Sequence, residues 1–142
     1  MKSPEMVLRR ALTTSTAFTS RAGTKVYPLA VPEKDTAGTK ISLPWVTWRR
    51  AGIQRAQTIG GPMGMPRVTV EYSIFAATYE DARELADTMR SILDGYGGTL
   101  DNTTVDQVSL ENEADDFVSL SGNEIPTAYQ ITQTYDVWWQ ET

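Results

Sequence analysis

Residues 67–100 read RVTVEYSIFAATYEDARELADTMRSILDGYGGTL, and they predict one strand that runs directly into one helix. Apolar and polar residues alternate at the start of this stretch, and a period of two is typical of a strand with one buried face. The predicted buried face consists of Val68, Val70, Tyr72, Ile74 and Ala76.

The pattern changes after Thr78, where apolar residues recur at steps of three and four and indicate one face of a helix. The residues on that face are Ala82, Leu85, Ala86, Met89, Ile92, Leu93 and Tyr96. Thr78 and Asp81 resemble a capping box, with Asp in place of the usual Glu or Gln. Gly95, Gly97 and Gly98 then supply a C-terminal stop.

Two short motifs at the ends of this helix resemble those of the tail-completion proteins of long-tailed bacteriophages, which are tail terminator or head–tail joining proteins. The motifs are AATYEDA at residues 76–82 and LDGYGGTL at residues 93–100. Further pieces follow the family order: an N-terminal helix, VYPL at 26–29, LPWVT at 43–47, a glycine-rich loop, and YDVWW at 135–139. The resemblance therefore extends over most of the chain.

This resemblance implies a structural virion protein that is not an enzyme. It implies a homomeric, hexameric ring at the tail–head junction, which is assembled in the host cytoplasm and ends polymerisation of the tail tube. The implied partners are further copies of the chain, the tail tube protein and the head connector or completion protein, with DNA passing through the lumen. A head-side connector protein and a small ligand-binding domain remain as alternatives.

The order of predicted elements indicates an α+β fold in a single domain that spans residues 1–142. We expect a mostly antiparallel sheet of about four to five strands, with two main helices packed on one face. In addition to the strand and the helix in residues 67–100, the sequence predicts a helix at 4–14 and an extended piece at 26–29. It also predicts strands at 43–50, 105–113 and 129–139. Loops are predicted at 13–20, 32–42, 51–66 and 114–126.

The composition excludes several classes of chemistry. The chain has no cysteine and no histidine, so zinc sites, thiol nucleophiles and Ser–His–Asp triads are not expected. The glycine-rich loop near Pro62 lacks the Gly-Lys-Ser/Thr ending of a phosphate loop. No apolar run approaches the roughly 20 residues that cross a bilayer, and no signal peptide is recognisable. We therefore predict no cofactor, no metal and no membrane.

Charge is distributed unevenly along the chain, whose net charge is −5. Residues 1–90 hold all 13 Lys and Arg with 8 of the 18 acids, whereas residues 91–142 hold 10 acids and no base. Either the two halves neutralise each other within one fold, or basic and acidic surfaces meet between copies in head-to-tail contacts. An overall acidic chain also argues against specific DNA binding, because like charges repel.

Residues around the long loop and in the acidic segment are the candidates for assembly contacts. Exposed methionines suit a docking surface, and arginines suit acidic surfaces of a neighbour. The candidates are Arg49, Arg50, Arg55, Met63, Met65, Arg67, Glu113, Asp115 and Asp116. Glu111 with the last three also raises a weak divalent-cation site as an alternative to a solvated acidic face.

Trp138 and Trp139 are adjacent in the last predicted strand, so they face opposite sides of the sheet. One of them is expected in the core. The other is expected under a helix or at an interface, where tryptophan is enriched.

Overall fold

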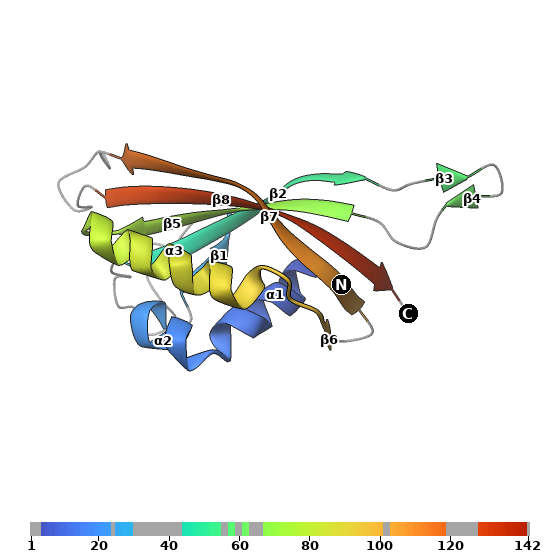
Figure 1. The fold of residues 1–142 in the computed structure, drawn as a ribbon, viewed down its shortest axis with the longest axis horizontal. Coiled ribbons are helices and arrows are strands. Elements are labelled where there is room, and N and C mark those ends of the chain that lie inside the picture. Colours follow the sequence, from blue (N-terminus) through green and yellow to red (C-terminus); the bar gives the residue numbers. More distant parts are fainter. Residues whose placement is uncertain are drawn as a thin grey trace.

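The computed structural model describes residues 4–23, 25–29, 44–54, 57–58, 61–62, 67–100, 103–118 and 128–141. In these residues, a curled six-stranded sheet carries three helices on one of its faces (Figure 1). The predicted α+β class and the placement of the helices on one face are confirmed. The predicted turn region at 32–42 lies outside the described residues.

The stretch that begins at Arg67 folds as its pattern predicts. Strand β5 (Arg67–Ala76) alternates strictly between buried and half-buried residues. Helix α3 (Tyr79–Leu93) follows at once, and the Thr78 side chain accepts a hydrogen bond from the Asp81 amide at 3.2 Å. The helix is capped at Asp94, and Gly95 takes a φ of +82°, a conformation that glycine adopts without strain.

The sheet has six strands instead of the predicted four to five, and it is mostly antiparallel, as predicted. Its order is β1-β2-β5-β8-β7-β6, and the two central strands are β5 and β8. Strand β8 spans Ala128–Glu141, and the other strands are β1 (Val26–Pro28), β2 (Trp45–Gln54), β6 (Gly98–Leu100) and β7 (Thr103–Val118). Strand β1 pairs parallel to β2, while every other pairing in this sheet is antiparallel.

The helical layer also contains one helix that was not predicted. Helix α1 (Pro4–Thr13) agrees with the expected helix at 4–14, but helix α2 (Thr16–Ala22) replaces the loop predicted at 13–20. Ser and Thr have only moderate helix propensity, so this segment lacks a local helical signal. Burial of Phe18 and Ala22 against the core supplies the stabilisation that local propensity does not.

Two predicted strands are too short. Strand β7 runs from Thr103 to Val118, so residues 114–118 belong to a strand and not to the predicted loop. β-Bulges at Val105/Gln107 and at Leu110/Asn112 interrupt the alternation within the predicted part of this strand. The missed end holds Asp115 and Asp116, and Asp is depleted in strands, so the sequence there indicates a turn. Strand β2 continues to Gln54, into the predicted loop, with a bulge at Arg50/Gly52.

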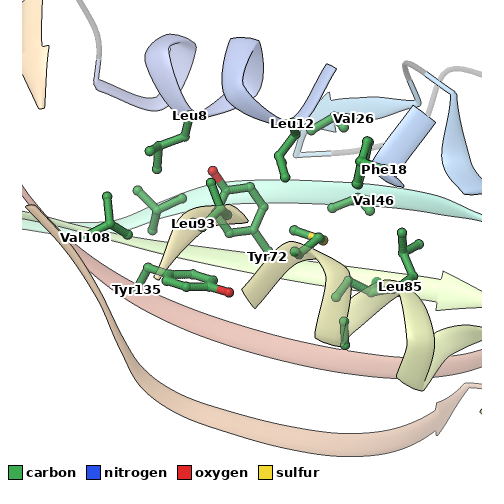
Figure 2. Close-up of a cluster of buried hydrophobic side chains, with 14 of the residues drawn as sticks. Leu8, Leu12, Phe18, Val26, Val46, Tyr72, Leu85, Leu93, Val108 and Tyr135 are labelled. Carbon is green, nitrogen blue, oxygen red and sulfur yellow. The ribbon is translucent and has the colours of Figure 1, made fainter. Parts of the chain in front are cut away.

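The core lies between the covered face of the sheet and the three helices. Figure 2 shows Leu8, Leu12 and Phe18 reaching from the N-terminal helices toward side chains of the sheet. Tyr72 of β5 and Tyr135 of β8 meet there edge to face, with ring centroids 5.8 Å apart. This layer gives the sheet one buried face, and none of the helices in the described residues lies on the opposite face (Figure 1). Within the described residues, no helix combines the length and the apolar character needed to cross a membrane.

Candidate assembly surfaces

The predicted contact loop at 51–66 contains more ordered structure than expected. Its first residues complete β2, and strands β3 (Gln57–Thr58) and β4 (Gly61–Pro62) form a separate two-stranded ladder. This ladder lies beyond the ends of β2 and β5, far from the helices (Figure 1). The candidate residues Arg55, Met63 and Met65 lie outside the described residues.

Arg49 and Arg50 lie on opposite faces of β2. On the open face, the Arg49 guanidinium donates to Glu71 of β5, with Nη2 3.3 Å from Oε2. On the covered face, Arg50 donates from Nε and Nη2 to both carboxylate oxygens of Glu5, at 2.6 and 3.0 Å. Glu5 is only 1% exposed, and its hydrogen bonds raise the pKa of Arg50. The Arg50–Glu5 pair therefore ties α1 to the sheet.

Arg67 and Asp136 face each other across β5 and β8 on the open face. Their charged atoms, Nη1 and Oδ2, are 3.6 Å apart, and the hydroxyl of Thr69 donates to the other carboxylate oxygen at 2.8 Å. Arg67 belongs to the basic part of the sequence and Asp136 to the acidic part. At this point, opposite charges of the two halves meet within one chain.

Glu113 and Asp115 of β7 face α3 and contact Arg83, a residue that the sequence did not single out. The Arg83 guanidinium donates to Glu113, to Asp115 at 3.5 Å and to Asp87 at 3.3 Å. Tyr79 also donates to Asp115 at 2.7 Å. The hydrogen bond to Glu113 is the main cause of a raised pKa for Arg83. Only the Asp87 partner, four residues away on the same helix, was visible in the sequence.

Gln133, which interrupts the apolar face of β8, is fully buried within a polar network. Its amide nitrogen donates to the Ala86 carbonyl at 3.0 Å and to Glu113 at 2.7 Å. Its amide oxygen accepts from the Tyr135 hydroxyl at 2.8 Å. The network links β8 to both α3 and β7, and it gives the buried amide of Gln133 and the hydroxyl of Tyr135 their hydrogen-bond partners.

The acidic cluster of β7 does not converge on one point. Glu111 is exposed and accepts from Ser109, Glu113 and Asp115 are turned toward Arg83, and Asp116 is exposed. Across the part of the chain that the structure describes, no group of three or more acidic residues is arranged to hold a metal ion. The acids are better suited to ion pairs than to cation binding.

The two C-terminal tryptophans occupy different environments. Trp139 is 2% exposed and lies on the covered face, so it is the core residue of the pair. Trp138 is half-buried on the open face, opposite Gln107 of β7 and Arg67 of β5. Trp45 and Phe75 also contact each other on this face, with ring centroids 6.2 Å apart. The open face thus combines aromatic side chains with hydroxyls and two ion pairs.

Comparison with known proteins gives one family and a structural match. Residues 6–139 match the family described as Tail completion protein gp17. A chain from the structure titled "Virion of native gene transfer agent (GTA) particle" is similar in fold, with a TM-score of 0.71 and 18% sequence identity. The match covers 94% of this chain and 91% of that chain. No curated protein matches this sequence.

Proposed function

The chain belongs to the tail completion protein gp17 family, and we propose that it forms a hexameric ring at the head-proximal end of a phage tail tube. In this role, the ring stops polymerisation of the tube and presents a new surface to the head connector. The protein acts as a structural component of the virion and not as an enzyme.

The observation that carries this proposal is the family match over residues 6–139, which includes nearly every element of the fold. The structural likeness to a chain of a gene transfer agent virion is consistent with a place in a phage-like particle. The resemblance of AATYEDA and LDGYGGTL to tail-completion motifs supports the same assignment from the sequence.

The projecting β3–β4 ladder gives the proposal a physical basis. A short two-stranded ladder is marginally stable without further packing, and this one lies away from the helices and the core (Figure 1). Packing against another subunit or against the tube supplies contacts that the isolated chain lacks. We assign Arg55, Met63 and Met65 to this contact, together with Arg67 at the base of the ladder.

The remaining candidates divide according to their environment. Arg49 and Asp116 are exposed at the sheet surface, and we assign them to contacts between subunits. Arg50, Glu113 and Asp115 take part in ion pairs within the chain, so their contribution to assembly is to position the two sheet edges that carry them. DNA passes the acidic ring without sequence-specific binding, because like charges repel.

Electron microscopy of lysates from a phage with this gene interrupted tests the proposal. Overlong tail tubes without heads are the expected result, and expression of the wild-type chain in trans should restore normal tails. Normal-length tails beside DNA-filled heads would instead assign the protein to the head side of the joint. Intact infectious virions in the absence of the protein would overturn the proposal.

A further inference from the structure

The two outermost strands of the sheet are much shorter than the strands they cover. Strand β1 has 3 residues against 10 in β2, and β6 has 3 residues against 16 in β7. Strand β1 pairs with β2 only at Val46–Trp48, and β6 pairs with β7 only at Thr103–Val105. Within the described ranges, no strand pairs with the rest of either outer edge.

Loops and helix ends close only part of these edges. On β7, the Gly95 amide donates to the Val108 carbonyl at 2.7 Å, and the Leu110 amide donates to Asp94 at 3.2 Å. On β2, the Leu29 amide donates to the Trp48 carbonyl at 2.8 Å. Beyond these hydrogen bonds, the outer edge of β2 continues along residues 49–54, and that of β7 continues along residues 111–115. Backbone groups along such an edge are a template for a further strand.

The two open edges carry opposite charges. Arg49 and Arg50 project from the two faces of β2, and both side chains remain partly exposed, at 54% and 40%. The end of β7 carries Glu111, Glu113, Asp115 and Asp116. Charged residues commonly protect an edge from pairing with its own kind. These arginines and acids also form ion pairs within the chain, with Glu71, Glu5 and Arg83. The attraction of a β2 edge for a β7 edge therefore comes from the exposed parts of these pairs and from the exposed Glu111 and Asp116.

We propose that the open edge of β2 in one copy of the chain pairs with the open edge of β7 in the next copy, so that the sheet continues from subunit to subunit. This inference rests on the proposed ring and names the contact that builds it. A contact between two different edges is head-to-tail, and such contacts close into rings when the rotation allows.

Strand direction agrees with this pairing. Three successive antiparallel pairings, β2–β5, β5–β8 and β8–β7, separate the two strands, so β7 runs opposite to β2. A neighbour related by rotation about a ring axis from which the strands are moderately tilted keeps these directions approximately. The contact between copies is then an ordinary antiparallel ladder.

Register adds a geometric condition. Through the pairings across β5 and β8, Arg50 is level with Leu110, and Gln54 is level with Gln107. The open segments of β2 and β7 therefore lie toward opposite ends of the strands. Neighbouring subunits must be staggered along the strand direction, as strands in closed barrels are.

Cysteine cross-linking tests the contact directly, because the chain has no cysteine of its own. Ala51 and Ala114 are both exposed, one on each open edge. Mild oxidation of the assembled variant Ala51→Cys/Ala114→Cys should give a ladder of covalent oligomers that ends at the ring size. The variant Ala51→Cys/Asn112→Cys tests the same contact in a register shifted by two residues.

Controls separate a head-to-tail contact from other arrangements. Each single cysteine variant should remain monomeric on a non-reducing gel, whereas a mixture of the two should give dimers and nothing larger. The pair Ser20→Cys/Ala114→Cys, with one cysteine on the exposed surface of α2, should remain uncross-linked. Dimers formed by a single variant would overturn the proposal, because they require two identical edges to meet.

Charge reversal gives a second readout. The variant Glu111→Lys/Asp116→Lys should lower the assembled fraction at least tenfold, and adding Arg49→Glu with Glu71→Arg should restore it. The variant Glu80→Lys/Asp81→Lys changes the net charge equally on α3 and should assemble as the wild type does.

The outcomes distinguish this inference from the proposed function. Rings seen by electron microscopy without any cross-link between the two edges would overturn the edge contact and leave the ring proposal intact. Monomers under all conditions, together with normal tails in the interrupted phage, would overturn both.

Discussion

The two faces of the sheet are built by alternate residues of the same strands, yet they have different tasks. On β5, Val70, Tyr72 and Ile74 are fully buried under the helices, while their neighbours Glu71 and Ser73 remain half-buried. The covered face is mostly apolar, with the Gln133 network and the Arg50–Glu5 pair as its main polar contacts, and the open face holds hydroxyls, aromatic rings and ion pairs.

The difference between the two faces indicates which of them supplies most of the folding stability. Burial of apolar side chains is the main favourable term in folding, and here it is concentrated on one face. Polar contacts on the other face contribute less, because partly exposed ion pairs are screened by solvent. The open face and the sheet edges are therefore the surfaces that the proposed assembly would use.

The largest test of the comparison is the adjacent tryptophan pair. Trp139→Ala removes a buried ring from the covered face and should lower the free energy of unfolding by about 3–5 kcal/mol. Trp138→Ala, on the open face, should cost clearly less and weaken assembly instead. Urea unfolding and sizing of the oligomer measure the two effects. Equal destabilisation by both substitutions would remove the distinction between the faces.

Alkaline pH offers a second test, because burial raises the pKa of both Tyr72 and Tyr135 above the ordinary value near 10. Above pH 10 the unfolded chain loses these protons while the folded chain keeps them, so stability falls as pH rises. For each tyrosine, the free energy of unfolding should then fall by about 1.4 kcal/mol per pH unit.

A pair of phenylalanine variants checks this origin. The two buried phenols lower the free energy of unfolding as pH rises, and Tyr72→Phe should remove about half of that decrease. Urea unfolding between pH 9 and about 11 measures it. Tyr79→Phe, at an exposed position of α3, is the matched control and should keep the wild-type slope. An unchanged slope in Tyr72→Phe would mean that other groups cause the loss.

Disruption of the Gln133 network should give the next largest loss of stability. Gln133→Ala leaves the Tyr135 hydroxyl and the Ala86 carbonyl without their partner, which should cost about 1–3 kcal/mol. Gln130→Ala, on the open face of the same strand, is expected to change stability by no more than about 0.5 kcal/mol. Thermal unfolding of both variants decides whether a buried amide matters more than a half-exposed one.

Arg49 of β2 gives the smallest effect, and its neighbour Arg50 sharpens the comparison within one strand. Arg49→Ala breaks a partly exposed pair with Glu71 and should cost less than about 1 kcal/mol. Arg50→Ala should cost more, because it leaves the buried carboxylate of Glu5 without its guanidinium partner. The reverse order in chemical unfolding would contradict the assignment of the two faces.

Local periodicity accounts for what the sequence predicted well. Strand β5 and helix α3 have uninterrupted patterns and a capping residue, so their type and their buried residues were predictable. The apolar face of β8 and its interruption at Gln133 were predictable for the same reason. Helix α2 was not predictable, because its stability depends on tertiary burial of Phe18. Strand β6 was missed because its first residue, Gly98, belongs to the glycines that were interpreted as the end of the helix.

The candidate surface was harder to predict than the fold. Charged residues near the loop and in the acidic segment were identifiable by composition, but their partners were not. Arg50 pairs with Glu5, which is 45 residues away, and Glu113 pairs with Arg83, which is 30 residues away. Such pairings depend on strand order and register, which a single sequence does not specify.

The position of β8 has a consequence for biosynthesis. The last strand along the chain lies between β5 and β7, in the middle of the sheet. A nascent chain that has emerged only as far as β7 cannot join the two halves of the sheet, and α1, which packs on β7, has no stable platform. The six-stranded sheet therefore cannot close until β8 has left the ribosome and inserted between β5 and β7.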